Sequence, residues 1–184
     1  MKKTLVTFLL TLLAALTLAG CGGSGGPAPQ SPPADCGKLL HAMLAADESF
    51  PEMTQIALSV RSMSPNTAEY QNGKKTFSYV SDLPFEKVES FAVGYSTDGR
   101  KADEIALICV TDEADAADAA ASLERHQADR LKLYQTYGPQ EAARVERGVV
   151  KTIDGKYAVL IICNDPDSVL DAFRSGLNGT AQDD

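Results

Sequence analysis

The sequence predicts an α+β domain built on an antiparallel four-stranded sheet. Three observations indicate this class: the apolar strands come in two pairs, an Asp-Gly turn joins each pair, and a helical segment follows each pair. We therefore expect two hairpin-helix units, preceded by an N-terminal helix.

The N-terminus has the pattern of a lipoprotein export signal. Lys2 and Lys3 precede an apolar run over residues 4–20, and LAGC at residues 18–21 matches the bacterial lipobox. In such a signal the Cys21 thiol is the acyl acceptor. We expect residues 1–20 to be removed, and two acyl chains on Cys21 to anchor the chain to the outward face of the cell membrane.

Residues 21–35 contain the lipidated cysteine and a linker. The stretch GGSGGPAPQSPPAD is rich in Gly, Ser and Pro, a composition that forms no core and behaves as a spacer of about 20 Å. Residues 36–176 are long enough for one domain, and residues 177–184 are predicted as a polar tail.

The charge of the chain excludes one class of partner. The sequence has 17 Lys and Arg against 25 Asp and Glu, and loss of the two signal lysines changes the formal net charge from −8 to −10. Such a charge is repelled by nucleic acid phosphates, so we expect no nucleic acid partner.

The first element of the domain is predicted as a helix over residues 38–46. Apolar residues in CGKLLHAMLAA fall at helical spacing, and Pro51 follows the end of the helix. From there to residue 84 the sequence is turn-rich, with SPN at residues 64–66 and NG at residues 72–73 as breakers. We predict no regular element in that region.

The first hairpin is predicted in the segment ESFAVGYSTDGRKADEIALICV. In its first strand Phe91, Val93 and Tyr95 occupy alternate positions. Asp98-Gly99 supplies the turn, and residues 105–110 form a continuous apolar run. A helix capped by Thr111 or Asp112 follows and runs to about Tyr137.

The second hairpin follows a short helix that begins after Gly138. VVKTIDGKYAVLII gives strand, Asp154-Gly155 turn and strand, and Pro166 opens a helix after an Asn-Asp cap. DEIALICVTD aligns with KYAVLIICND, which indicates either an internal duplication or the shared chemistry of strand-to-helix segments.

The burial pattern of the strands predicts their order. The second strand of each hairpin is apolar on both faces, so the second strands should be central and the first strands should lie at the edges, in the order 1-2-4-3. The long helix would cover one face of the sheet through its apolar stripe. The helix of residues 38–46 is the candidate for the other face.

Three cysteines remain once Cys21 carries lipid. The alignment of the two units places Cys109 and Cys163 on opposite faces of the sheet, which predicts no direct bridge between them. We interpret Cys36, Cys109 and Cys163 as buried free thiols, with a Cys36 pairing and a reactive thiol as the alternatives.

No catalytic or metal-binding motif is recognised, and we expect no cofactor and no metal. His41 and His126 lie in no Cys/His spacing and are predicted at the surface or its boundary. The acidic pairs at residues 103–104 and 112–113 lie where a strand and a helix begin, which is a common place for acidic side chains.

Aromatic residues gather in and beside the turn-rich region. Tyr70, Phe77, Tyr79 and Phe85 form a candidate binding surface. The alternative interpretation is that these side chains fill the edge of the core, as most aromatic residues do.

The segments ADEIALICVTD, YGPQE and GKYAVLIICND occur in this order behind a lipobox and a proline-rich spacer. In this respect the chain resembles the small Firmicutes lipoproteins that carry domain of unknown function 4358, over roughly residues 36–176. The resemblance implies a lipid anchor and a shared domain. It implies no activity, because that family has no assigned catalytic residues, and Cys109 and Cys163 are not part of its pattern.

These features favour a membrane-anchored binding or interaction module. Its expected partner is an extracytoplasmic protein or a small ligand, besides the membrane that holds the lipid. Two alternatives stay open: an enzyme or enzyme subunit whose site is assembled from scattered carboxylates, and a structural component of an assembly.

Overall fold

The computed structural model describes residues 35–180 and confirms the α+β class. The elements in chain order are α1 (Cys36–Ala45), β1 (Met53–Leu58), η1 (Val60–Ser62), α2 (Ala68–Phe77), η2 (Phe85–Lys87), β2 (Val88–Ser96), β3 (Glu104–Val110), η3 (Glu113–Asp115), α3 (Ala116–Tyr137), α4 (Pro139–Glu146), β4 (Val149–Ile153), β5 (Tyr157–Ile162) and α5 (Pro166–Thr180), where η marks a short 3-10 helix. The predicted signal peptide, the lipidation site Cys21 and most of the linker lie outside the described residues. Helix α5 continues past residue 176 into the predicted tail.

The strands form one antiparallel sheet in the order β1-β2-β3-β5-β4. The predicted order 1-2-4-3 is confirmed for the two hairpins, which are β2-β3 and β4-β5. The predicted number of four strands is wrong, because β1 pairs with β2 and places Ile56 opposite Val93. Strand β2 is therefore an interior strand, and β1 takes the edge position expected for it.

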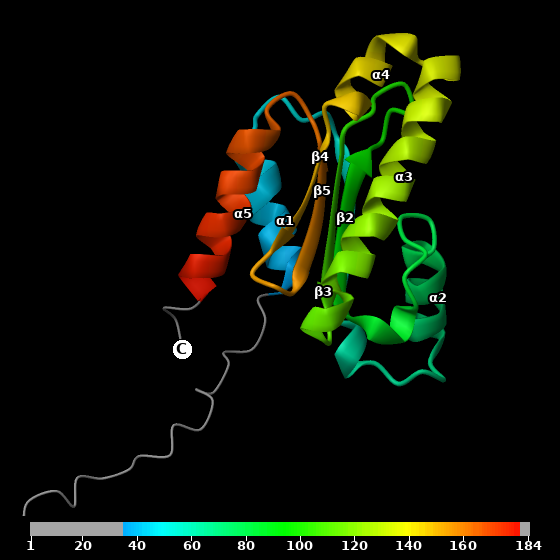
Figure 1. Ribbon diagram of the computed structural model, residues 1–184, viewed down its shortest axis with the longest axis vertical. Helices are drawn as coiled ribbons and strands as arrows, with labels where there is room; N and C mark the ends of the chain where they lie inside the picture. The colour runs from blue at the N-terminus through cyan, green and yellow to red at the C-terminus, as the bar shows by residue number, and fades with distance from the viewer. Residues whose placement is uncertain (1–34, 181–184) are drawn as a thin grey trace, which may run out of the picture. The chain divides into compact units, whose positions relative to one another are not determined.

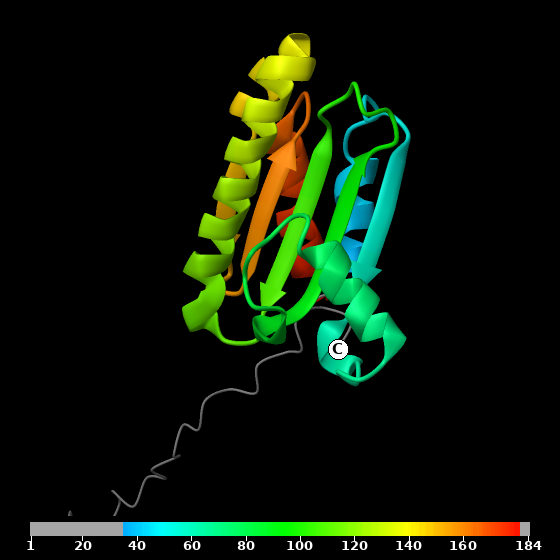
Figure 2. The same ribbon diagram turned by 90° about the vertical axis from the view of Figure 1, so that its right-hand side faces the viewer.

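Helices cover both faces of the sheet (Figure 1). Helices α1 and α5 pack on one face, while α2 and α3 pack on the other. In the turned view of Figure 2, α3 runs along the near face and α2 lies beside it near one end of the sheet. The first helix covers the second face as predicted, and α5 shares that face with it. Strands β3 and β5 are buried along their whole length, because both of their faces are covered.

The turn of the second hairpin has the geometry that its Asp-Gly sequence predicts. Asp154 and Gly155 have φ angles of 52° and 65°, and the Lys156 N–H donates to the Ile153 carbonyl at 3.3 Å. Two successive residues with positive φ define a type I′ turn, whose twist matches that of the flanking strands.

The region predicted as turn-rich contains β1 and α2. Helix α2 is capped by Thr67, whose Oγ1 accepts from the Tyr70 N–H at 3.2 Å. The predicted breaker Asn72-Gly73 lies inside α2, so this prediction is wrong. Gly73 instead brings the helix close to β1, since a Cβ at this position would lie 2.8 Å from Leu58 Cδ1. Tertiary packing here overrides the local preference of Asn-Gly for a turn.

All three cysteines of the described residues are free, buried and on the α1/α5 face. The prediction that Cys109 and Cys163 point to opposite faces is wrong. In the β3-β5 register Cys109 lies opposite Tyr157, so odd-numbered residues of both strands share one face. Because the two thiols lie at opposite ends of the paired strands, roughly 20 Å still separates them, which is beyond the reach of a disulfide.

Candidate functional site

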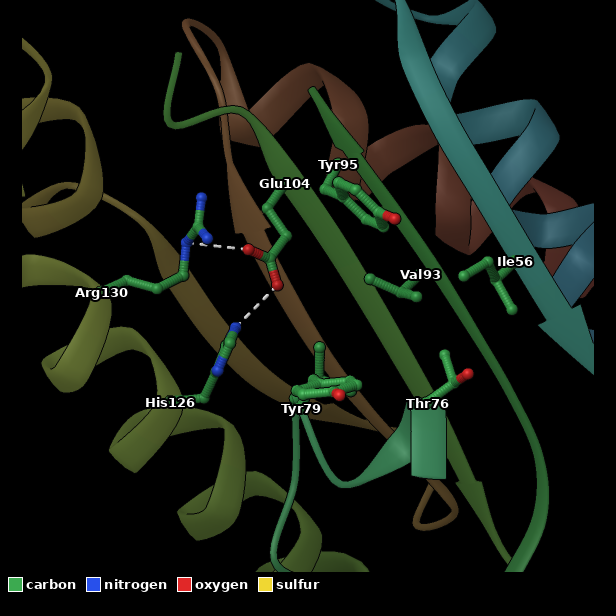
Figure 3. A pocket seen from close by; sticks show the side chains of 9 residues that line it. Ile56, Thr76, Tyr79, Val93, Tyr95, Glu104, His126 and Arg130 are labelled. Atoms are coloured by element: carbon green, nitrogen blue, oxygen red, sulfur yellow. Dashed lines mark hydrogen bonds and ion pairs between the residues drawn. The ribbon is translucent and has the colours of Figure 1, made fainter. Parts of the chain in front are cut away.

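A pocket of about 300 Å³ opens on the α2/α3 face of the sheet. The strand register forms its floor. Ile56 of β1 lies beside Val93 of β2, and one step along the same face Tyr95 lies beside Glu104 of β3. The walls come from the end of α2, the turn after it and the middle of α3. The lining residues are Ile56, Thr76, Tyr79, Val80, Val93, Tyr95, Glu104, His126 and Arg130 (Figure 3).

The turn after α2 is fixed to α3 by a chain of hydrogen bonds. The Leu83 N–H donates to Ser81 Oγ at 3.1 Å, and Ser81 Oγ lies 2.6 Å from Ser122 Oγ. Ser122 in turn donates to the Ala119 carbonyl at 2.8 Å. Both serines are buried. Both serine hydroxyls therefore have hydrogen-bond partners, and these bonds hold the turn against the helix.

A bidentate ion pair joins the same two segments at the surface. Arg125 donates from Nε and Nη2 to the two Asp82 oxygens at 3.0 and 2.6 Å. Tyr79 precedes this attachment by only three residues and lines the pocket. The wall that carries Tyr79 is therefore preformed.

Glu104 is the buried acid of the pocket and lies at the start of β3, where the floor meets α3. Its side chain is only 3% exposed, and each of its oxygens has a partner on α3. Oε1 lies 2.7 Å from His126 Nε2, and Oε2 lies 2.8 Å from Arg130 Nε. Figure 3 shows the carboxylate between these two side chains. One turn of helix separates His126 from Arg130, so both reach the same carboxylate.

Arg130 is held by further contacts on the side away from Glu104. Its Nη2 donates to the Ala102 carbonyl at 3.1 Å, and its guanidinium lies 5.3 Å from the centre of the Tyr134 ring. The Tyr134 hydroxyl donates to the Lys101 carbonyl at 2.6 Å. These contacts fix the guanidinium at the start of β3.

A second ion cluster lies beside the pocket, at the same end of the sheet. Arg144 Nη1 lies 2.6 Å from Asp103 Oδ2 and 3.1 Å from Glu141 Oε2. Glu141 also accepts from the Ala102 N–H at 3.0 Å. Burial raises the pKa of the Asp103 carboxyl, and Arg144 counteracts that rise. The adjacent acids 103 and 104 thus join different clusters, and only Glu104 lines the pocket.

The four aromatic residues of the candidate binding surface have different environments. Phe77 and Phe85 are buried in the core, 5.3 Å apart between ring centres. Tyr70 packs edge-on against Phe85 at 5.0 Å. Tyr79 alone is largely exposed, at 70%, and it lines the pocket. The structure therefore brings Tyr79 to the site and places the two phenylalanines in the core.

Tyr79 is the one lining residue that belongs to the candidate binding surface, and the sequence analysis does not assign Glu104, His126 or Arg130 to a site. The available signal was the spacing of His126 and Arg130 on one helix, together with the acidic pair at residues 103–104, where an apolar strand begins. His41 lies on α1, on the other side of the sheet, and contributes nothing to the pocket.

The described part of the chain has neither a cluster of metal ligands nor a membrane-spanning helix. No group of three or more His, Cys, Asp or Glu side chains in residues 35–180 is arranged to hold a metal ion. Over the same range, no helix is long and apolar enough to cross a membrane.

The chain was also compared with known proteins. No curated protein and no solved structure matches it. A family model described as "Domain of unknown function (DUF4358)" matches residues 63–163, which include every lining residue of the pocket except Ile56. Because this match spans more than half of the sequence, the chain belongs to the DUF4358 family.

Proposed function

We propose that this protein is a lipid-anchored extracytoplasmic binding module whose ligand occupies the pocket between α2 and α3. The lipobox cysteine Cys21 would hold the chain at the outer face of the cell membrane. Residues 22–35 would act as a spacer of about 20 Å between the lipid and the domain.

The observation that carries this proposal is the composition of the pocket. Ile56, Val80 and Val93 supply an aliphatic surface, and Glu104, His126 and Arg130 converge on one wall. A concave site with an apolar lining and a few fixed polar groups is the usual form of a small-ligand site. Its volume of about 300 Å³ is at the lower end of the range for such sites.

The preformed wall further supports a binding role. The turn that carries Tyr79 is attached to α3 through Ser81 and through Asp82. A ligand would therefore meet an ordered site and lose little free energy in ordering it.

The binding proposal is tested by what the protein retains when it is purified. The acylated full chain is extracted from its native membrane, and small molecules released on denaturation are identified by mass spectrometry. We expect a retained compound to be lost from the Tyr79→Ala variant and kept by Tyr137→Ala. Tyr137 is the matched control because it is 81% exposed and does not line the pocket. Equal retention by both variants would contradict a role of this pocket.

The anchoring proposal has a separate test. Growth with an alkyne-bearing fatty acid should label the chain, and Cys21→Ser should abolish both the label and membrane association. A Cys36→Ser variant should keep the label, because Cys36 follows the spacer and begins α1. Labelling that survives Cys21→Ser would refute the lipobox assignment.

An enzymatic role is the second candidate, and the Glu104–His126 contact favours it. A buried carboxylate that accepts from His Nε2 leaves Nδ1 as a proton acceptor, which is how a carboxylate orients a catalytic base. If the bound compound is converted, His126→Gln should stop the conversion and preserve binding. Binding without any conversion by the parent protein would leave the binding module as the function.

A further inference from the structure

The pocket wall has balanced charge. Glu104 contributes one negative charge and Arg130 contributes one positive charge at a distance of 2.8 Å. These two charges cancel, and neither of the two groups leaves a net fixed charge on the wall. Beside this wall Arg144 pairs with both Asp103 and Glu141, so that cluster has one carboxylate in excess, but none of its three side chains lines the pocket.

Balanced charge disfavours ligands with a single charge at this position. A carboxylate that approaches Arg130 also approaches Glu104, and an ammonium that approaches Glu104 also approaches Arg130. In either case one neighbour attracts the ligand and one repels it. A hydroxyl group meets no such conflict, because it can donate to a carboxylate and accept from a guanidinium or an imidazole.

The rest of the pocket suits a ring with apolar C–H faces. Tyr79 and Tyr95 line it from different elements, with side chains that are 70% and 39% exposed. Figure 3 shows Tyr79 near the end of α2 and Tyr95 on β2, on either side of Val93. Exposed aromatic side chains offer flat apolar surface at small conformational cost. The aliphatic floor between them has room for a small apolar substituent.

We propose that the pocket binds a neutral saccharide. Its hydroxyls would contact Glu104, His126 and Arg130, and its C–H face would lie against Tyr79. An apolar substituent such as an N-acetyl methyl would cover Ile56 and Val93. This inference rests on the proposed binding function and adds the chemical class of the ligand.

The test compares three sugars that differ in charge. Full-length acylated protein, in a detergent without sugar headgroups, is titrated with N-acetylglucosamine, with glucosamine, which bears an ammonium, and with N-acetylmuramic acid, which bears a carboxylate. Saturation-transfer NMR reports binding and gives each Kd. We expect the neutral sugar to bind at least about fivefold more tightly than either charged one.

Two variants connect that binding to the pocket. Tyr79→Ala should weaken the neutral sugar by about tenfold, because it removes the aromatic surface, and Tyr137→Ala should leave it unchanged. Glu104→Gln should weaken the neutral sugar and strengthen N-acetylmuramic acid, because the repelling carboxylate is gone. Each variant is compared with the parent only after urea denaturation shows that it is folded.

The outcomes separate the ligand class from the binding function. If a charged sugar binds as tightly as the neutral one and Tyr79→Ala weakens both, the pocket is a binding site but does not select neutral sugars. The proposal of a neutral ligand is then wrong. If no sugar binds while indole, used as an apolar aromatic probe, binds in a Tyr79-dependent way, the saccharide proposal is overturned. If neither the sugars nor indole respond to Tyr79→Ala, the proposed function fails as well.

Discussion

At the residue scale, Arg130 determines whether the buried Glu104 charge is tolerated. Its side chain is 20% exposed and pairs with a carboxylate that is 3% exposed. Replacement by Met keeps much of the volume and leaves Glu104 with His126 as its remaining partner. We expect Arg130→Met to lower the free energy of unfolding by about 3 kcal/mol, as measured by urea denaturation.

Arg174 provides the matched control for that substitution. It forms an ion pair with Asp171 on α5, but both side chains are more than half exposed. Arg174→Met should change the free energy of unfolding by less than about 0.5 kcal/mol. Equal effects of the two substitutions would show that Glu104 does not depend on Arg130.

The buried thiols predict a loss of stability at alkaline pH. Burial raises the pKa of Cys36 to about 12, of Cys109 to about 11 and of Cys163 to about 12. The unfolded chain releases these protons near pH 9, so the native state holds them more tightly. The contribution of each thiol is complete below pH 9 and is lost as pH rises, at about 1.4 kcal/mol per pH unit.

A single substitution isolates this effect. Between pH 9 and pH 10.5 the free energy of unfolding should decrease less steeply with pH in Cys109→Ala than in the parent. The two slopes should differ by about 1.4 kcal/mol per pH unit. Urea denaturation under reducing conditions at several pH values gives the two slopes. Parallel slopes for the parent and the variant would show that Cys109 ionises alike in the folded and unfolded chains.

The sequence allowed only part of the site to be predicted at this scale. Tyr79 belongs to the candidate binding surface, and it lines the pocket. Phe77 and Phe85 have the same aromatic character but lie in the core, because burial depends on which face of α2 and η2 meets the sheet. The contact of His126 with Glu104 joins residues that the chain brings together only through the packing of α3 on β3.

At the element scale, the junction between α4 and β4 has little room for an added side chain. Gln127 on α3 donates from Nε2 to the Val145 and Gly148 carbonyls at 2.8 and 2.9 Å. A Cβ at Gly148 would lie 2.9 Å from the Val145 carbonyl oxygen and 2.9 Å from Ile162 Cγ1. A backbone oxygen cannot rotate away, so the junction itself would have to shift.

We therefore expect Gly148→Ala to lower the free energy of unfolding by about 1–3 kcal/mol. Thermal and urea denaturation would measure the loss. The matched control is Gly99→Ala in the turn between β2 and β3, where an added Cβ meets no atom within 4 Å. If both substitutions have the same small effect, the close contacts at Gly148 do not limit the packing of α4.

The strand order followed from the sequence because burial on both faces can be read from a continuous apolar run. Strand β1 could not be predicted from the sequence, since Thr54 and Ile56 are its only β-branched residues. Its identity as a strand comes from pairing with β2, which is distant in sequence. Sequence patterns report local propensity, and an edge strand of this kind is specified mainly by its partner.

The internal alignment of the two hairpin-helix units bears on which face of the sheet each helix covers. The alignment places Ile105 over Ala158, whereas the antiparallel register places Ile105 opposite Ile161. Residues 158 and 161 are an odd number of positions apart, so their side chains lie on opposite faces of β5. Aligned residues of the two units therefore point to opposite faces of the sheet. This explains why α3 and α5, which follow corresponding strands, cover different faces.

At the scale of the whole molecule, the domain depends on two separate hydrophobic cores. One core lies between the sheet and the α2/α3 layer, and the other lies between the sheet and the α1/α5 layer. The family match over residues 63–163 contains α2 through β5 and omits α1, β1 and α5. The segment matched by the family model therefore has only one of its two helical layers.

This division predicts that the matched segment does not fold alone. A fragment of residues 63–163 would expose the sheet side chains that α1 and α5 cover. These are Ala92, Ile105, Leu107, Cys109, Tyr157, Val159 and Ile161. It would also leave β2 as an unpaired edge, and an apolar face of this size together with an open edge favours aggregation.

We expect the 63–163 fragment to aggregate or to lack a cooperative unfolding transition, and we expect a 35–180 fragment to be monomeric and cooperative. Size-exclusion chromatography and thermal denaturation followed by circular dichroism distinguish the two. A third fragment, residues 35–163, lacks α5 alone among the helices and strands. The absence of α5 uncovers the surface of the sheet and α1 on which Val169, Leu170 and Phe173 pack. An intermediate loss of stability there would show that α1 and α5 each stabilise the second layer. A stable, monomeric 63–163 fragment would instead mean that the α2/α3 core is sufficient for folding.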